Sequence, residues 1–143
     1  MTTKGKIILA VLAAGALLAG AAGFVAGRYY IDNKKPNFSE KYVLYVRPEM
    51  SVAEVMDSLQ AGAGTVRPKS VERAFAKMEM DANMKPGRYV VDSTSTSIYV
   101  ARMLVYGWQT PQNMTLSGTL RKKDRIAQRI SSQMMVDSAS VAD

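Results

Sequence analysis

Any acid/base chemistry in this chain would rest on carboxyl groups, because the sequence contains neither histidine nor cysteine. Thiolate nucleophiles, Ser-His-Asp triads and most zinc sites are thereby excluded. General acid catalysis needs a carboxyl whose pKa is raised by burial or by a neighbour. Five glutamates are available: Glu40, Glu49, Glu54, Glu72 and Glu79. Each has a simpler structural role at a helix end or beside a strand, so the residues predict no catalytic group, no metal site and no cofactor.

Sugar binding is a second chemistry that the residue types allow. The single tryptophan, Trp108, lies between Tyr106 and Gln109 in a loop bounded by glycine and proline. An exposed aromatic ring beside an amide donor suits the apolar face and the hydroxyl groups of a sugar. Packing of Trp108 in the hydrophobic core explains the same pattern. We take Tyr106, Trp108 and Gln109, together with Arg88, as glycan-binding candidates.

Positive charge is in excess, with 19 Lys and Arg against 12 Asp and Glu and a net charge of +7. The densest cluster is Arg-Lys-Lys-Asp-Arg at residues 121–125, with Arg129 following. A solvated helical face accounts for such a cluster, and contact with anionic lipid or an anionic cell-wall polymer is the alternative. No aromatic residues alternate with the cations, so nucleic acid is not an expected partner.

An apolar N-terminal segment predicts where the chain resides. Ile7 to Ala26 is a run of twenty residues without a charge, about 30 Å as a helix, which matches the hydrocarbon thickness of a bilayer. Lysines precede the run, and an arginine with two tyrosines follows it, as at a membrane interface. We expect a cytoplasmic tip and transmembrane anchor over residues 1–27. A cleaved signal peptide is the alternative, because small residues inside the run form cleavage-site patterns.

A linker is expected between this segment and the folded part. Residues 32–37 are polar, contain a proline and show no apolar period. The first strand signal begins only at Tyr42. Residues 28–41 are therefore predicted to connect the membrane segment to a domain without belonging to either.

The next fifty residues predict a β-α-α-β unit over residues 42–92. Its two strands are expected at 42–46 and 88–92, which are rich in β-branched and aromatic residues. Ser51 and Glu54 form a capping box at the start of the first helix, and Pro68 lies in the first turn of the second. Apolar residues recur at helical spacing in both helices.

The remaining residues, 93–143, predict a second unit that starts without finishing. We expect a helix closed by Gly107, a third strand over 113–117 and a helix over 122–135. Asp137 has the position of an N-cap for another helix, and no helix stop signal follows it. The chain is therefore expected to be the front part of a longer protein.

Two sequence blocks, taken with the order of the elements, resemble a known family. The blocks are Gly87-Arg88-Tyr89-Val90-Val91 and Tyr106-Gly107 followed by Gln109-Thr110-Pro111-Gln112-Asn113-Met114-Thr115-Leu116. Behind a single N-terminal span, they resemble the front of the endolytic murein transglycosylase family (MltG or YceG-like), and are similar to the pattern in Bacteroidetes-type members. The motif residues of that resemblance are Gly87, Tyr89, Gly107, Pro111, Asn113, Arg121 and Asp124.

The resemblance implies an α+β protein with a transmembrane helix, a LysM-like β-α-α-β subdomain over 42–92 and the first strand and helices of an incomplete transglycosylase domain over 93–143. It implies a single-pass protein of the cell inner membrane with its C-terminal part in the periplasm. The family cleaves nascent peptidoglycan strands to 1,6-anhydro ends, using one glutamic acid with a raised pKa. That glutamate is expected beyond this chain, which would then be inactive alone and provide anchoring and glycan recognition.

The partners implied are peptidoglycan glycan strands, membrane lipid and cell-wall synthesis proteins, without cofactor, metal or nucleic acid. A non-catalytic scaffold module, tethered to the membrane and binding glycan or protein, is the alternative. The two hypotheses differ in whether the reading frame is expected to continue into a block that bears the catalytic glutamate.

Overall fold

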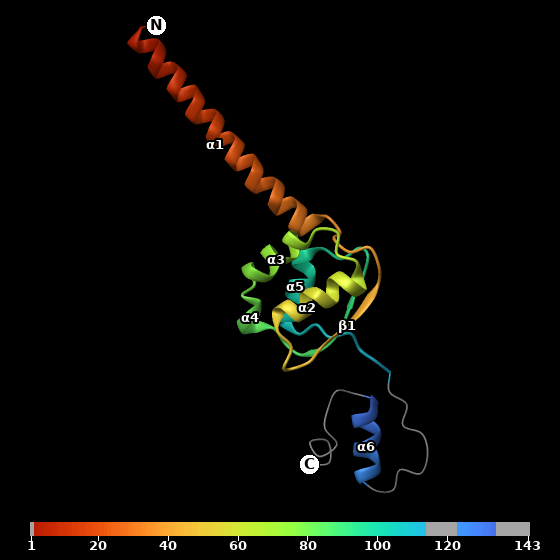
Figure 1. The fold of residues 1–143 in the computed structure, drawn as a ribbon. Coiled ribbons are helices and arrows are strands. Elements are labelled where there is room, and N and C mark those ends of the chain that lie inside the picture. The colour runs from red at the N-terminus through yellow and green to blue at the C-terminus, as the bar shows by residue number, and fades with distance from the viewer. Residues whose placement is uncertain (1, 114–122, 134–143) are drawn as a thin grey trace.

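The computed structural model describes residues 2–113 and 123–133. A long helix leads into a small α+β domain, and a further helix follows (Figure 1). The α+β class predicted from the sequence is confirmed. In chain order the elements are α1 (Thr3–Lys34), β1 (Tyr42–Val46), α2 (Val52–Ser58), the π-helical turn η1 (Leu59–Ala63), α3 (Pro68–Lys77), α4 (Met80–Asn83), β2 (Gly87–Val91), α5 (Ser97–Tyr106) and α6 (Lys123–Gln133).

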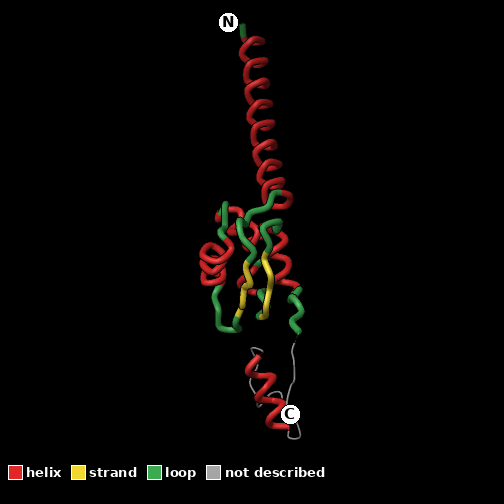
Figure 2. The backbone as a smooth tube through the Cα atoms, turned by 90° about the vertical axis from the view of Figure 1, so that its right-hand side faces the viewer, coloured by secondary structure: helices red, strands yellow, loops and turns green. Residues whose placement is uncertain are grey.

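Helix α1 projects from the domain as an isolated apolar rod (Figures 1 and 2). Its 32 residues correspond to about 48 Å of helix. None of them is buried, and large apolar side chains such as Leu17 are 75% exposed. The helix is long and apolar enough to cross a membrane, as the uncharged run predicted.

Strands β1 and β2 form an antiparallel pair, the two yellow segments of Figure 2. Tyr42 lies opposite Val91, and side chains alternate so that Leu44, Tyr89 and Val91 point into the core. The first strand has the predicted bounds, and the second begins one residue earlier than predicted. A two-stranded sheet is only marginally stable alone, so its apolar face must be covered by helices.

The two predicted helices begin where the sequence predicts, and a short additional helix, α4, follows α3 before β2. Ser51 Oγ accepts a hydrogen bond from the Glu54 backbone N–H at 3.3 Å, and the Ser51 N–H donates to Glu54 Oε2 at 2.7 Å, which confirms the capping box. Helix α2 continues into η1 and ends at Gly64, whose φ of 63° is left-handed. Pro68 is the first residue of α3, as predicted.

One hydrophobic core joins the sheet to α2, α3 and α5. Its fully buried side chains include Leu44, Val55, Phe75, Tyr89 and Leu104. Helix α5 packs against α3 and contacts β2. The boundary predicted between residues 92 and 93 therefore runs through a single packed unit. The physical reason is the small size of the sheet, which needs α5 as a third layer to exclude water.

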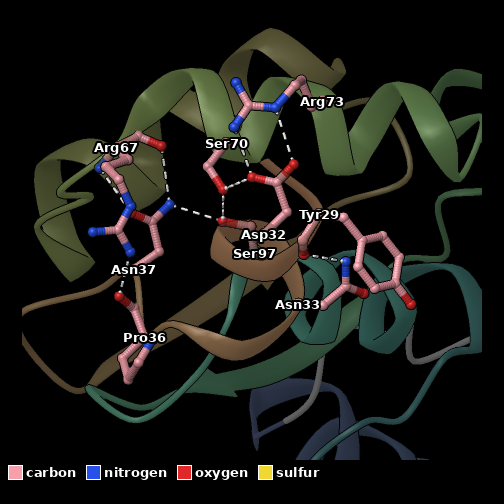
Figure 3. Close-up of polar contacts among 9 residues, drawn as sticks. All are labelled: Tyr29, Asp32, Asn33, Pro36, Asn37, Arg67, Ser70, Arg73 and Ser97. Carbon is pink, nitrogen blue, oxygen red and sulfur yellow. Dashed lines mark hydrogen bonds and ion pairs between the residues drawn. The ribbon is translucent and has the colours of Figure 1, made fainter. Parts of the chain in front are cut away.

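The end of α1 belongs to the domain, although residues 28–41 were expected to form a linker (Figure 3). Helix α1 continues to Lys34 without a break. Near its end, Asp32 accepts hydrogen bonds from Arg73 at 2.7 and 3.0 Å and from the Ser70 hydroxyl at 2.5 Å. Both donors lie on α3, so the helix is attached directly to the domain.

The residues that follow α1 are also packed rather than free. The Asn37 side chain is buried, donates to Ser97 Oγ at 2.8 Å and to the Arg67 carbonyl at 3.0 Å, and accepts from the Arg67 N–H at 2.7 Å (Figure 3). Phe38 is part of the core. The polar composition suggested a linker because a polar side chain whose hydrogen bonds are satisfied inside a fold looks, in sequence, like a solvated one.

The structure describes only some of the elements predicted for the C-terminal region. Helix α6 falls within the helix predicted over 122–135. Beyond Asn113, the strand predicted over 113–117 lies outside the described residues. The same applies to Arg121 and to the helix predicted from Asp137.

Candidate functional site

Helix α5 carries two exposed tyrosines on one face. The helix begins after Thr96, whose hydroxyl oxygen accepts a hydrogen bond from the Tyr99 backbone N–H at 3.3 Å. Tyr99 and Tyr106 are seven residues apart, about two helical turns, so both project from the same side. Val100 and Leu104 are buried in the core, while the two tyrosines remain 48% and 54% exposed.

A chain reversal at Gly107 brings Trp108 against these tyrosines. Gly107 ends α5 with a left-handed φ of 70°, and the N–H groups of Gly107 and Trp108 both point to the Met103 carbonyl. The Trp108 ring centroid lies 5.4 Å from that of Tyr106 and 6.3 Å from that of Tyr99. Trp108 is 50% exposed. We refer to Tyr99, Tyr106 and Trp108 as the aromatic cluster.

The chain after Trp108 is held along the free edge of β2. The Thr110 N–H donates to the Arg88 carbonyl at 3.0 Å, and Thr110 Oγ1 accepts from the Val90 N–H at 3.2 Å. The Trp108 backbone is therefore fixed on both sides, by the helix end before it and by the strand after it. This arrangement keeps the exposed indole in one place without burying it.

An open groove of about 460 Å³ includes Tyr99 in its lining. It is lined by Lys41, Val90, Asp92, Thr94, Ser95, Thr96 and Tyr99. Hydroxyl, ammonium and carboxylate groups of this kind can donate to and accept from the hydroxyls of a ligand. We refer to these seven residues as the hydroxyl groove. Because Tyr99 belongs to both features, an extended ligand that lies on the aromatic cluster can reach into the groove.

Two of the predicted glycan-binding candidates, Tyr106 and Trp108, are thus brought together at the surface. The alternative for Trp108, packing in the core, is not what the structure shows, because half of the side chain is exposed. Tyr99 was missed in the sequence. Its signal was available, because a spacing of seven residues from Tyr106 within one helix places both rings on one face.

The other two candidates, Gln109 and Arg88, hold the loop in place. Gln109 Nε2 donates to the Pro86 carbonyl at 3.2 Å, and Arg88 Nη1 donates to the Thr110 carbonyl at 3.3 Å. A Cβ atom on Gly87 would lie 2.4 Å from Gln109 Cδ, so a larger residue at this position would displace the Gln109 side chain. In this structure both side chains position the aromatic cluster.

The remaining motif residues have local structural roles or lie at the surface. Tyr89 is buried, and its hydroxyl donates to the Lys85 carbonyl at 2.9 Å. Burial raises the pKa of Tyr89 above its ordinary value. Pro111 and Asn113 are exposed, and Asp124 is exposed in the first turn of α6.

The glutamates of the domain show structural roles or stand at the surface. Glu54 completes the capping box, where hydrogen bonds from the N-cap serine lower its pKa, the opposite of what a general acid needs. Glu49 pairs with Arg47 at 3.3 Å on the surface. Glu72 and Glu79 border a second, largely apolar hollow of about 510 Å³ beside α3. Within residues 2–113 and 123–133, no three acidic side chains gather closely enough to hold a metal ion.

In comparisons with known proteins, no family model matches this chain, and no curated protein or solved structure matches it. A fold does not by itself imply a function, so the function has to be argued from the chemistry of the site. The aromatic cluster and the hydroxyl groove are the features with that chemistry.

Proposed function

We propose that this chain is a membrane-anchored module that binds glycan strands, and that it forms the anchoring and glycan-recognition part of an endolytic murein transglycosylase. The observation that carries the binding proposal is the aromatic cluster, in which the half-exposed Trp108 ring lies within 6.3 Å of both tyrosine rings and Tyr99 also lines the hydroxyl groove. Monomeric proteins seldom expose aromatic rings in such a group without a binding role.

The physical match is between two kinds of surface. A sugar ring has an apolar face of C–H groups and a rim of hydroxyls, so it needs an aromatic surface beside polar donors and acceptors. The tilted rings of Tyr106 and Trp108 provide the aromatic surface. The hydroxyl groove provides the polar donors and acceptors, among them Lys41, Asp92 and Thr94.

The anchoring part rests on α1. Burying its exposed apolar side chains in hydrocarbon removes from water a surface that nothing within residues 2–113 and 123–133 covers. Lys4 and Lys6 at one end and Arg28 with its tyrosines at the other stand where interfacial groups are favourable. We place the helix in the cell inner membrane and the domain in the periplasm, in keeping with a peptidoglycan ligand.

The assignment to a transglycosylase rests on the two sequence blocks around Gly87 and Gly107. Cleavage of a glycosidic bond to a 1,6-anhydro end requires a protonated carboxyl at the leaving oxygen. We assign that role to no described residue. A non-catalytic scaffold is the second candidate, and the use of Glu54 as a helix cap favours it. Mass spectrometry of glycan strands incubated with the chain tests cleavage: 1,6-anhydro ends formed by the chain alone would contradict the scaffold, and would also contradict a purely anchoring and recognition role.

Glycan binding is tested by co-sedimentation of the full chain, in nanodiscs, with purified peptidoglycan. We expect Trp108→Ala to weaken binding about tenfold, because stacking of one aromatic ring contributes on the order of 1 kcal/mol beyond its buried area. Tyr99→Ala should act in the same direction. Both changes remove half-exposed rings, so the domain should stay folded, as thermal unfolding can verify.

The matched control is Tyr45→Ala, which removes a tyrosine of similar exposure, 49%, from β1 outside the aromatic cluster. Its binding should equal that of the parent chain. Failure of the parent chain to sediment with peptidoglycan would contradict the glycan-binding proposal. Equal losses of binding in the cluster variants and in the control would contradict it as well.

A further inference from the structure

Successive contacts between α1 and α3 advance toward the C-terminal end of α3 and go back toward the N-terminal end of α1. Arg73 on α3 bonds to Asp32 on α1 (Figure 3). One turn further along α3, the Lys77 Nζ atom lies 5.2 Å from the centroid of the Tyr29 ring, nearly one turn back along α1. The C-terminal end of α3 therefore lies toward the apolar segment of α1. This places α3 side chains next to the helix where it would leave a membrane.

Each of the two helices carries a cation at this level. Arg28 lies one turn before Asp32 on the same face of α1, and its guanidinium stands 4.2 Å from the Phe24 ring centroid, directed toward the apolar segment. Lys77 lies one turn beyond Arg73 on the same face of α3. The Asp32 carboxylate is engaged by Arg73. Within residues 2–113 and 123–133, neither Arg28 nor Lys77 has a carboxylate in ion-pair distance.

The depth of these groups matches a lipid headgroup layer. Tyr29 is three residues beyond Ala26, the end of the uncharged run, which is about 4.5 Å along the helix axis. The headgroup layer extends roughly 5–8 Å on each side of the hydrocarbon. Tyr29, with Lys77 beside it, would thus stand within the headgroup layer, and Arg28, whose side chain turns toward Phe24, at the boundary of that layer with the hydrocarbon.

We propose that Arg28 and Lys77 together bind the phosphate of an anionic lipid and so fix α3 against the membrane surface. This inference rests on the proposed membrane anchor. A guanidinium and an ammonium from two different helices can hold one phosphate from two sides. A zwitterionic headgroup is bound less well, because its own cation is repelled by the same pair. The occupant is therefore a lipid with net negative charge, such as phosphatidylglycerol.

The test uses the full chain in nanodiscs of phosphatidylcholine with a minor share of phosphatidylglycerol. Native mass spectrometry after release measures which lipids stay bound. In the double variant Arg28→Gln/Lys77→Gln we expect the preference for phosphatidylglycerol to fall about thirtyfold, since each cation near an anionic surface contributes about fivefold. The charge-conserving variant Arg28→Lys/Lys77→Arg should keep the preference.

The matched control, Arg47→Gln/Lys85→Gln, removes two exposed cations near the end of the sheet where Val46 pairs with Gly87. It should leave the preference for phosphatidylglycerol unchanged. An unchanged preference in Arg28→Gln/Lys77→Gln, or an equal fall in the control, overturns the inference. Alkaline washing of the membranes separates the two proposals. A chain that stays embedded without a lipid preference refutes only the phosphate site, whereas a chain that is washed off refutes the anchor as well.

Discussion

Asp32 is the residue through which α1 is joined to the domain. Its side chain is only 14% exposed and receives hydrogen bonds from Arg73 and Ser70. Burial by itself raises the pKa of Asp32. The hydrogen bonds from Arg73 and Ser70 and the positive charge of Arg73 outweigh that effect, so the pKa of Asp32 lies below its ordinary value of 3.8. One carboxylate therefore links the stability of the junction to pH.

We expect Asp32→Asn to lower the free energy of unfolding of the domain by about 1–2 kcal/mol at neutral pH. The range is modest because the Arg73 side chain is 34% exposed and solvent screens the pair. Because the pKa of Asp32 is lowered in the folded state, its contribution is present above the unfolded value. It is lost as the pH falls through the folded value. Chemical denaturation from neutral to acidic pH measures the effect, and the variant should lose less stability in acid than the parent.

The matched control for this prediction is Arg47→Gln. It breaks the exposed pair with Glu49, whose side chains are 64% and 70% exposed, and it should change stability by less than about 0.5 kcal/mol. If the free energy of unfolding falls with pH in Asp32→Asn as it does in the parent chain, Asp32 is not the group that links stability to pH.

At the level of elements, the C-terminal end of α5 decides the shape of the candidate site. A helix that ended one residue later would carry Trp108 away from Tyr106 and Tyr99. The left-handed residue Gly107 prevents this by reversing the chain, and the strand-edge contacts of Thr110 keep it reversed. The site is thus a product of one helix end and one strand edge.

We expect Gly107→Ala to destabilise the domain by about 1–2 kcal/mol, because an L-residue is strained at a φ of 70°. Binding to peptidoglycan should weaken as well, since Trp108 is displaced from the cluster. Thermal unfolding and co-sedimentation measure the two effects. Gly20→Ala is the matched control, because a Cβ atom there meets nothing within 4 Å, and it should change neither.

On the scale of the whole molecule, α1 and the domain form one continuous body. Helix α1 ends at Lys34, and Asn37 and Phe38 are already buried in the domain. A glycan site on the domain would therefore be held at a fixed height and orientation above a membrane, rather than at the end of a flexible tether. Such fixation favours glycan strands that lie close to the lipid surface.

This rigidity predicts a narrow distance distribution between spin labels on α1 and on the domain. The sequence has no cysteine, so labels attach only at introduced positions such as Leu18→Cys and Glu49→Cys. Pulsed electron paramagnetic resonance in nanodiscs should give a narrow distribution, and adding Asp32→Asn should broaden it. A broad distribution in the doubly labelled parent would show that α1 is hinged.

The features that could be predicted are those that depend on residues close together in the sequence. The capping box of Ser51 and Glu54, the strand Tyr42–Val46 and the helix start at Pro68 depend on contacts within a few positions. The missed features depend on partners far along the chain. Asn37 was assigned to a linker because Ser97 and Arg67, which satisfy its amide, are 60 and 30 residues away. Two of the three residues of the aromatic cluster, Tyr106 and Trp108, were found because they are near neighbours, and Tyr99, seven residues before Tyr106, was missed.

Hydrophobic periodicity, caps and one long uncharged run were sufficient for the apolar helix, the α+β class and the positions of the strands, because these follow from the local backbone and from transfer of side chains out of water. Tertiary packing decided the rest. It turned the polar stretch after the apolar segment into a packed junction in which Asn37 is buried, because hydrogen bonds between distant residues can offset the cost of burying a polar side chain. It also joined α5 to the core of a sheet too small to exclude water alone, and in doing so it gathered three aromatic rings on the surface.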